Sequence, residues 1–270
     1  MVTFLFWNIN RKPLQAEVAN LAVSHNADLV ILAECHVPIA TMLRSLNARG
    51  PGLYRLADSL CDQVSIYTRF STRFLRPRHD SSRFTIRQLA LPARTDILIA
   101  AAHLPSKMRW SDTSQAFECA EFARTVREVE AEIGHTRTVI VGDLNMNPFE
   151  DGLLAASGLN AAMTREIASR GARTVQGRLY PFFYNPMWGR FGDTTQGPPG
   201  TYYYESSEHV ATFWHMFDQV LVRPELLDRF GHDTLKILTT DGVVELLDEK
   251  GHPDSSGFSD HLPIVFELDL

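Results

Sequence analysis

Polar side chains that could do chemistry follow several apolar runs of this 270-residue chain. The segment VIVGDLNMNP (139–148) puts Asp143 and Asn145 just after such a run. Residues two apart in a strand point to the same face, so this spacing predicts that Asp143 and Asn145 point together while Leu144 turns into the core. The alternative is a polar turn ahead of the following proline, which Asp and Asn favour.

The same pattern recurs at other apolar runs, in the segments FLFWNIN, DLVILAE, LIAAAHL, HMFDQVLV and SDHLPIVFEL. The polar residues there are Asn8 with Asn10, Glu34, His103, Asp218, and Asp260 with His261. One such strand end would be an ordinary turn, whereas a set of them predicts a site. Carboxylates and amides offer the oxygen ligands that Mg²⁺ prefers, and carboxylates and imidazoles act as general acids and bases.

The elements that must position these residues follow from hydrophobic periodicity. Strands are predicted over 2–9, 27–34, 63–69, 83–92, 96–104, 138–143, 217–223, 233–240 and 262–268. Helices are predicted over 13–25, 38–48, 113–133 and about 150–157, with a short turn over 224–229. The clearest helix carries an apolar stripe of Phe117, Ala120, Ala123, Val126, Val129 and Ile133. Many strands with interspersed helices and no dividing linker predict one α/β domain over residues 1–270.

Composition narrows the class of protein. The formal net charge of −6 and the pI near 5.9 give no global electrostatic signature of nucleic-acid binding, although a local basic patch or a bound cation can reverse the sign where it matters. The apolar start is too short for a membrane span and lacks the features of a signal peptide. Three cysteines without CxxC spacing predict a reducing, cytoplasmic compartment.

Six segments together resemble one known family. WNIN, ILAE, AHLPS, GDLNMNP, FDQVLV and SDHLPI have the order and approximate spacing of the endonuclease/exonuclease/phosphatase superfamily, from residue 7 to 266. This superfamily includes deoxyribonucleases, abasic-site nucleases, inositol-polyphosphate phosphatases and sphingomyelinases. The resemblance implies a four-layer α/β sandwich of two packed, mostly antiparallel sheets flanked by helices. It also implies hydrolysis of a phosphate ester by in-line attack of water with Mg²⁺, for which Mn²⁺ can substitute.

The resemblance also implies roles for the metal-binding residues and for the residues that handle water. Glu34 is the expected metal ligand, with Asn10 supporting it and Asp260 completing the site. Asp143 is expected to orient or deprotonate the attacking water. Asn145 and Asn8 are expected to donate amide hydrogens to the phosphate or to Asp143.

Two histidines complete the expected catalytic set. His261 would contact the scissile phosphate, with its tautomer fixed by Asp218, and the sequence leaves open whether it acts as a base or as an electrostatic clamp. His103 resembles the histidine form of deoxyribonucleases and many phosphodiesterases. Abasic-site nucleases usually carry a tyrosine there.

Two regions bear on the substrate. One is a strand-turn-strand region with six arginines, which could contact a phosphate backbone or form a solvated hairpin surface: Arg69, Arg73, Arg76, Arg78, Arg83 and Arg87. The other is the aromatic-rich stretch 158–216, whose expected substrate-binding residues are Arg178, Arg190, Tyr202, Tyr203 and Tyr204. The alternative for that stretch is a satellite core beneath a loop.

The leading hypothesis is a metal-dependent nuclease acting on DNA or RNA. A second is a phosphatase or phosphodiesterase for a small or lipid-linked phosphate ester. A third is an inactive binding scaffold of the same fold, against which the intact polar set argues. A zinc site at His209, His215 and Asp218 lacks any supporting motif. The sequence leaves the oligomeric state open.

Overall fold

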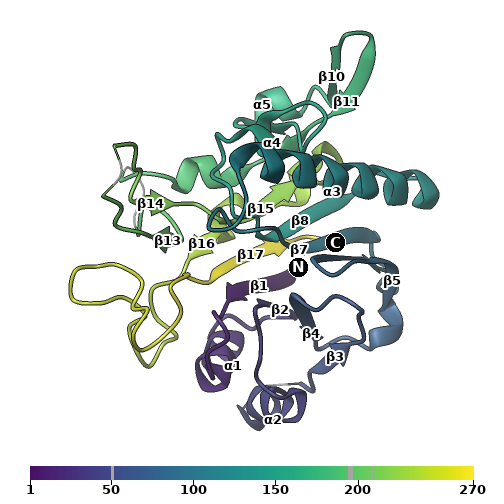
Figure 1. Ribbon diagram of the computed structural model, residues 1–270. Coiled ribbons are helices and arrows are strands. Elements are labelled where there is room, and N and C mark those ends of the chain that lie inside the picture. The colour runs from purple at the N-terminus through teal and green to yellow at the C-terminus, as the bar shows by residue number, and fades with distance from the viewer. Residues whose placement is uncertain (50–51, 194–196, 208) are drawn as a thin grey trace.

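The computed structural model describes residues 1–49, 52–193, 197–207 and 209–270. Two β-sheets lie face to face between helices, so the chain forms layers in the order helix, sheet, sheet, helix (Figure 1). Such layers are stable because each sheet buries one face against the other sheet and the opposite face against helices.

The first sheet has six strands among the described residues, in the order β16-β17-β1-β2-β4-β3. Its strands are β1 (Val2–Asn8), β2 (Leu29–Ala33), β3 (Arg55–Ala57), β4 (Val64–Thr68), β16 (Lys236–Ile237) and β17 (Ile264–Leu268). The pair β1 and β2 is parallel, and the other pairs are antiparallel.

The second sheet has seven strands in the described part of the chain, in the order β5-β6-β7-β8-β15-β12-β9. These are β5 (Leu75–Asp80), β6 (Phe84–Leu89), β7 (Ile97–His103), β8 (Thr138–Asp143), β9 (Ala161–Ala162), β12 (Phe183–Tyr184) and β15 (Asp218–Val222). The pairs β7–β8 and β9–β12 are parallel, and the others are antiparallel.

Helices cover the outer faces of both sheets (Figure 1). Helices α1 (Gln15–Ser24) and α2 (Ile39–Arg49) pack on the first sheet, and α3 (Asp112–Ile133) packs on the second. The shorter helices are α4 (Asp151–Leu154), α5 (Arg165–Ala168) and the 3₁₀ turns η1 (Thr72–Phe74), η2 (Pro186–Arg190), η3 (Pro224–Arg229) and η4 (His232–Thr234). Two small ribbons, β10 (Ala172–Val175) with β11 (Arg178–Pro181) and β13 (Tyr202–Tyr203) with β14 (Trp214–His215), lie outside the sheets.

The predicted sandwich of two mostly antiparallel sheets flanked by helices is confirmed. Two details of the prediction are wrong. The 233–240 strand is reduced to β16 after a 3₁₀ turn. On α3, Ala123, Val126 and Val129 are buried as predicted, but Phe117 is 71% exposed, because the buried face continues through Gln115, Cys119, Phe122 and Glu130.

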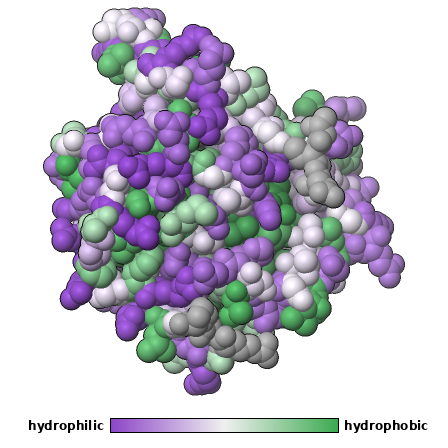
Figure 2. All heavy atoms as spheres, turned by 180° about the vertical axis from the view of Figure 1, so that it is seen from behind, coloured by the Kyte–Doolittle hydropathy of each residue, from purple (hydrophilic) through white to green (hydrophobic). Residues whose placement is uncertain are grey.

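The stretch 158–216 is not irregular throughout, since it contains the short strands β9 to β14. The β10–β11 hairpin projects from the top of the molecule, away from β13 and β14 (Figure 1). Seen from behind, the surface is mostly hydrophilic, with hydrophobic side chains in small separate groups (Figure 2). None of the described helices has the length and apolar character needed to cross a bilayer.

Candidate active site

Four strands put a polar residue at the end of the row of side chains that faces the core between the sheets. Apolar residues at alternate positions of these strands, such as Phe6, Ala101, Val141 and Val220, belong to that core. Because strand side chains alternate between faces, the next position in each row faces the same way. Those positions hold Asn8 on β1, His103 on β7, Asp143 on β8 and Asp218 on β15.

A chain of contacts joins these residues to His261. The Asn8 Nδ2 group donates to Asp143 Oδ2 over 2.9 Å, and this oxygen lies 3.8 Å from His261 Nε2. On its other side, His261 Nδ1 lies 2.8 Å from Asp218 Oδ2. The register of the antiparallel pair β8–β15 places Asp143 opposite Asp218. His261 therefore bridges two carboxylates that the sheet holds in fixed positions.

The charge of His261 is set by this position. Burial disfavours the charged imidazolium, but the negative charges of Asp218 and Asp143 outweigh burial and raise the pKa of His261 to about 10. A carboxylate beside an imidazole favours the protonated form, which donates hydrogen bonds from both nitrogens. The two neighbouring carboxylates therefore favour the protonated form of His261.

Glu34 and His103 form the other side of the cluster. His103 Nε2 lies 3.5 Å from Glu34 Oε1 and 3.6 Å from Asp143 Oδ2. The second ring nitrogen, Nδ1, lies 3.2 Å from Oε1 of Gln63. Glu34 follows the last residue of β2 with a left-handed backbone, at φ 48°. His103 thus lies between the carboxylates of Glu34 and Asp143.

The side chains of Asn10 and Asn145 do not follow the strand alternation that the sequence suggested. Both strands end two residues earlier, and Asn10 and Asn145 adopt positive φ values of 46° and 51°. Their backbone N–H groups donate to Asn8 Oδ1 and Asp143 Oδ1, as in Asx turns. Of the two side-chain amides expected to donate to the phosphate or to Asp143, that of Asn8 donates to Asp143, whereas that of Asn145 donates to Leu104 O.

Asp260 lies beside the end of β1. The neighbouring Ser259 donates from Oγ to Asn8 O and accepts the His261 N–H, which ties this segment to the cluster. The buried Oδ1 atom of Asp260 has no hydrogen-bond partner among the described residues. A buried carboxylate oxygen without a partner is costly unless a cation or donor completes it. Glu34, Asp260 and the Asn10 amide therefore fit a hard divalent cation by the chemistry of their oxygens.

Asp143, Asp218 and His261 form a second group that has the ligand types of a metal site. Ligand atoms of Asp143, Asp218 and His261 all lie within 4.8 Å of one another, which is close enough for a metal ion. A metal there would require unprotonated His261, whereas its carboxylate neighbours favour the proton. The zinc site at His209, His215 and Asp218, for which the sequence has no supporting motif, is not assembled among the described residues, since His215 Nδ1 contacts Asn147 Nδ2 at 3.0 Å.

The three consecutive tyrosines have different surroundings. Tyr202 lies against His261, with ring centroids 4.8 Å apart, and burial together with Asp260 and Asp143 raises the pKa of Tyr202 to about 12. Tyr203 stacks on His252 at 3.6 Å, so it packs in a satellite cluster. Tyr204 is 57% exposed. Tyr202 lies at the cluster, and the exposed Tyr204 lies close enough to influence the pKa of Tyr202.

The predicted arginines are not brought to the cluster. Arg178 lies in the projecting β10–β11 hairpin (Figure 1). Arg190 donates to His232 O at the other end of the sheets and lines a groove of about 620 Å³ with Asp233 and Lys236. Distance from the cluster makes both unsuitable for contact with a scissile phosphate there.

The six-arginine region is mostly occupied by internal contacts. Arg69 pairs with Asp28 at 2.6 Å, and the buried Arg87 pairs with Asp80 at 2.8 Å. Arg83 lies at the cluster, since its carbonyl accepts the His103 N–H. The region therefore offers less free positive charge than its sequence indicates.

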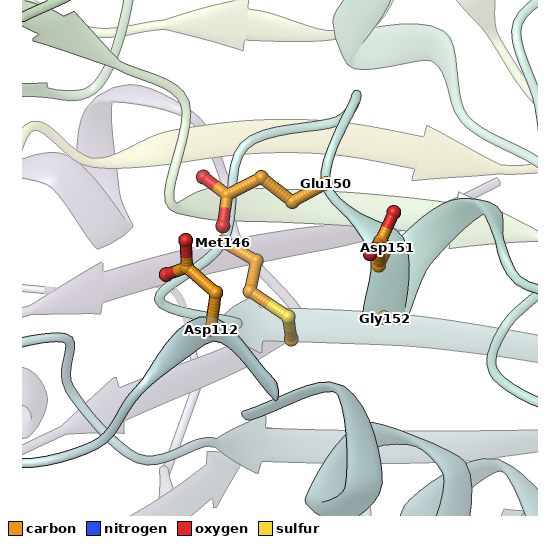
Figure 3. A pocket seen from close by; sticks show the side chains of 5 residues that line it. All are labelled: Asp112, Met146, Glu150, Asp151 and Gly152. Atoms are coloured by element: carbon orange, nitrogen blue, oxygen red, sulfur yellow. The ribbon is translucent and has the colours of Figure 1, made fainter. Parts of the chain in front are cut away.

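An acidic pocket of about 200 Å³ lies beside the segment that follows β8, lined by Asp112, Met146, Glu150, Asp151 and Gly152 (Figure 3). Lys107 compensates two of its carboxylates, because its Nζ lies 2.9 Å from Asp112 Oδ1 and 2.5 Å from Glu150 Oε2. The pocket contains none of the predicted site residues.

Three residues at the cluster were not predicted from the sequence. Gln63 contacts His103, Thr201 Oγ1 accepts the Asp218 N–H at 3.1 Å, and Arg11 contacts Glu34. Gln63 is the first residue of the predicted strand 63–69 and directly precedes β4, whereas Thr201 comes from a connection without a periodic pattern. Arg11 directly follows WNIN, which is the one signal that could have identified it.

Comparison with known proteins adds independent findings. A family model described as the Endonuclease/Exonuclease/phosphatase family matches residues 5–261. Comparison with curated proteins gave no match.

Several solved structures are similar in fold. Truncated TDP2 from Caenorhabditis elegans has 16% identity and a TM-score of 0.55, covering 98% of this chain and 97% of its own. The endonuclease domain of TRAS1, a telomere-specific non-LTR retrotransposon, has 14% identity and a TM-score of 0.53, covering 100% and 98%. TDP2 from D. rerio, complexed with a single-strand DNA product, has 13% identity and a TM-score of 0.56, covering 100% and 99%. At these identities the similarity concerns the fold alone.

Proposed function

Because the chain belongs to the endonuclease/exonuclease/phosphatase family, we propose that it is a divalent-metal-dependent phosphodiesterase whose substrate is DNA or RNA. The whole chain, residues 1–270, would act as one catalytic domain in a reducing, cytoplasmic compartment, in keeping with its three unpaired cysteines. The observation that carries the proposal is the contact chain Asn8–Asp143–His261–Asp218 next to Glu34.

Asp143 is the proposed base or orienting group for the attacking water. Hydrogen bonds from Asn8 Nδ2 and from the Asn145 backbone hold both of its oxygens, so its carboxylate is fixed before substrate binds. A positioned carboxylate of this kind contributes by accepting a proton in the transition state. His103, between Asp143 and Glu34, limits the reorientation of either carboxylate.

His261 is the proposed clamp for the scissile phosphate. The raised pKa supports a charged imidazolium that donates to a phosphoryl oxygen, which favours the clamp over the base. Asp218 keeps that charge in place from the opposite ring nitrogen. Tyr202 packs on the imidazole and restricts its rotation.

Glu34, Asp260 and Asn10 are the residues that would hold Mg²⁺ or Mn²⁺. When bound, the cation would offset negative charge on the phosphate and on the leaving oxygen. The partnerless Oδ1 of Asp260 and the mostly buried carboxylate of Glu34, 19% exposed, support this assignment.

The test is a panel assay on chelator-treated protein with Mg²⁺ or Mn²⁺ restored, using single-stranded DNA, duplex DNA, RNA, a small diester and a phosphate monoester. We expect hydrolysis of a nucleic acid that disappears with excess chelator, and Glu34→Gln should need more metal for half-maximal activity. Full turnover without metal would refute the metal assignment. Turnover of the monoester alone would refute the nuclease.

One observation favours a second candidate, a hydrolase of small phosphate esters. Several basic side chains near the cluster are already paired: Lys107 with Glu150 and Asp112, and Arg11 with Glu34. With a net charge of −6, the protein would gain little from long-range attraction of a polyanion. The same panel separates this candidate by its preference for the small diester or the monoester.

A further inference from the structure

Arg11 makes two contacts with Glu34, the proposed metal ligand. Its backbone N–H donates to Glu34 O over 3.0 Å, and its Nε lies 2.9 Å from Glu34 Oε2. The arginine side chain is 62% exposed, whereas that of Glu34 is 19% exposed. A solvent-facing guanidinium therefore covers one oxygen of a carboxylate that is otherwise mostly enclosed.

The backbone at both residues has an unusual conformation. Arg11 and Glu34 have φ values of 59° and 48°, in the left-handed region that costs free energy for residues with a Cβ. Such conformations cluster at functional sites, where the surroundings maintain them. Glycine would adopt this conformation at position 11 without the Cβ penalty, so the guanidinium is the part of Arg11 that the site gains.

The neighbouring Lys12 makes different contacts. Its Nζ donates to the carbonyls of Ser255 and Phe258, which anchors the turn ahead of Asp260. The backbone on the C-terminal side of Arg11 is thus fixed. Among the described residues, the ion pair of Arg11 is with Glu34 alone, so its exposed guanidinium can leave without breaking other contacts.

The charges around Glu34 explain why a cation is needed there. Asp143 and Asp260 add carboxylates to this end of the sheets, and the two ring nitrogens of His261 face Asp218 and Asp143 rather than Glu34. His103 Nε2 faces Glu34 Oε1 at 3.5 Å, which leaves Oε2 to Arg11. Arg11 is therefore positioned to compensate the carboxylate that the proposed metal would otherwise compensate.

We propose that Arg11 is a stand-in cation for Glu34 that exchanges with the divalent metal and, once released, pairs with the substrate phosphate. This inference rests on the proposed function for the metal and the phosphate. Release is cheap because exposed ion pairs are weak, and a guanidinium matches two phosphate oxygens at once. Arg11 would thereby couple occupancy of Glu34 by metal to substrate binding.

The first test measures metal binding without catalysis. Chelator-treated wild type, Arg11→Met, Arg11→Gly and the control Arg124→Met are titrated with Mn²⁺, and free Mn²⁺ is followed by electron paramagnetic resonance. Arg124 forms exposed ion pairs with Glu121 and Glu128 on α3 and belongs to no part of the proposed site. Loss of an exposed competing pair should tighten Mn²⁺ binding by about twofold to fivefold in both Arg11 variants. Arg11→Gly also relieves the left-handed backbone, so it remains informative if Arg11→Met folds poorly. Unchanged or weaker Mn²⁺ binding in the Arg11 variants would overturn the exchange.

The second test measures KM and kcat separately on a dinucleotide at saturating Mn²⁺. Arg11→Met should raise KM on the order of tenfold, the effect of losing a hydrogen bond to a charged group, and leave kcat nearly unchanged. Arg11→Lys should recover part of the loss, since it keeps the charge but not the planar fork. An unchanged KM would overturn the phosphate contact.

The two tests also separate this inference from the proposed function. If wild type hydrolyses no phosphate ester with Mn²⁺ while Arg11→Met binds Mn²⁺ more tightly, the proposed function is wrong and the exchange stands. If wild type is active and metal-dependent while the Arg11 variants bind Mn²⁺ like wild type, the exchange is wrong and the proposed function stands.

Discussion

Strand β15 carries buried charge at both ends, and the hydrogen bonding of the two charges differs. Asp218 begins the strand, contacts His261 and retains an Oδ1 atom with no partner among the described residues. Arg223 directly follows the strand, and its Nε and one terminal nitrogen donate to the two oxygens of Glu130 over 2.8 and 2.9 Å. Its other terminal nitrogen donates to two carbonyls, and its guanidinium lies over the ring of Phe183.

This difference separates charge buried for structure from charge buried for chemistry. At the Arg223 end, Thr138 adds a further donor to Glu130 Oε1 over 2.6 Å, so both carboxylate oxygens have donors, and we call this end saturated. At the Asp218 end, lone pairs stay open and Asn10, Glu34 and Asn145 have left-handed backbones. A saturated pair resists further binding, whereas open lone pairs can accept a proton, a cation or a substrate donor.

The largest expected effect is at the open end. Asp143→Asn should reduce kcat by on the order of 10² to 10⁴, the contribution of a general base. The amide that replaces the carboxylate has one oxygen that can accept, so one of the two hydrogen bonds to this side chain is lost. Removing a negative charge from a cluster of carboxylates offsets part of that loss. The melting temperature should therefore shift by no more than about 4 °C.

Both quantities are measured on one preparation, with the metal-dependent substrate identified by the panel assay. A structural Asp143 would reverse the pattern, with a lowered melting temperature and an intact rate per folded molecule. Wild-type kcat in a stable variant would remove Asp143 from the mechanism.

The saturated end should give the opposite result. Arg223→Met leaves Glu130 as an unpaired buried charge, which should destabilise the fold by about 3–5 kcal/mol in urea unfolding. The rate per folded molecule should stay at the wild-type value. Replacing Glu130 by Leu in the same variant should recover part of the stability, but not all, because the carbonyls of Pro181 and Phe182 still lack the donor that Arg223 supplied. Loss of kcat in folded Arg223→Met would contradict the division between the two ends.

The two ends were not equally predictable from the sequence. Strand alternation is a local property, so the rows that include Asn8, His103, Asp143 and Asp218 could be extended correctly from the apolar residues at alternate positions next to them. The alternation stops where the strand stops, which is why Asn145 does not point alongside Asp143.

Residues supplied by tertiary packing left no local signal. Thr201 reaches Asp218 from a connection whose path depends on the whole fold, and the contact of Gln63 with His103 joins the start of β4 in one sheet to the end of β7 in the other. Strand β5 was missed because its Pro77 cannot donate to a neighbour, and it occurs on an edge strand at an irregularity, where proline is tolerated. The Arg223–Glu130 pair joins a strand end to the buried side of a helix, which periodicity alone would assign to apolar residues.

A smaller effect is expected for substrate contact at the open end. Tyr204→Ala should raise KM for single-stranded DNA by an amount equivalent to about 1–3 kcal/mol if its exposed ring stacks on a base, and leave KM for a small diester unchanged. Arg178→Ala in the remote hairpin is the matched control and should change neither value. Equal increases in KM on both substrates would mean that Tyr204 supports the folded site and does not stack on a base. An increase in KM for Arg178→Ala would mean that the hairpin contacts the substrate.

The smallest expected effect is a pH dependence of stability at the saturated end, where Asp96 precedes β7. Burial alone would raise the pKa of Asp96, but hydrogen bonds from Gln88, Arg137 and His135 together lower it to about 2. A lowered folded-state pKa gives stability that is present above the ordinary value near 4 and is lost as the pH falls towards 2. Because the group is partly exposed, solvent screening reduces the contribution to about 1 kcal/mol or less.

The free energy of unfolding of wild type and of Asp96→Asn is measured by urea unfolding between pH 5 and pH 2, in steps of about one pH unit. The difference in unfolding free energy between the two proteins should shrink as the pH falls over that interval. A constant difference would mean that the Asp96 charge adds nothing to the saturated end.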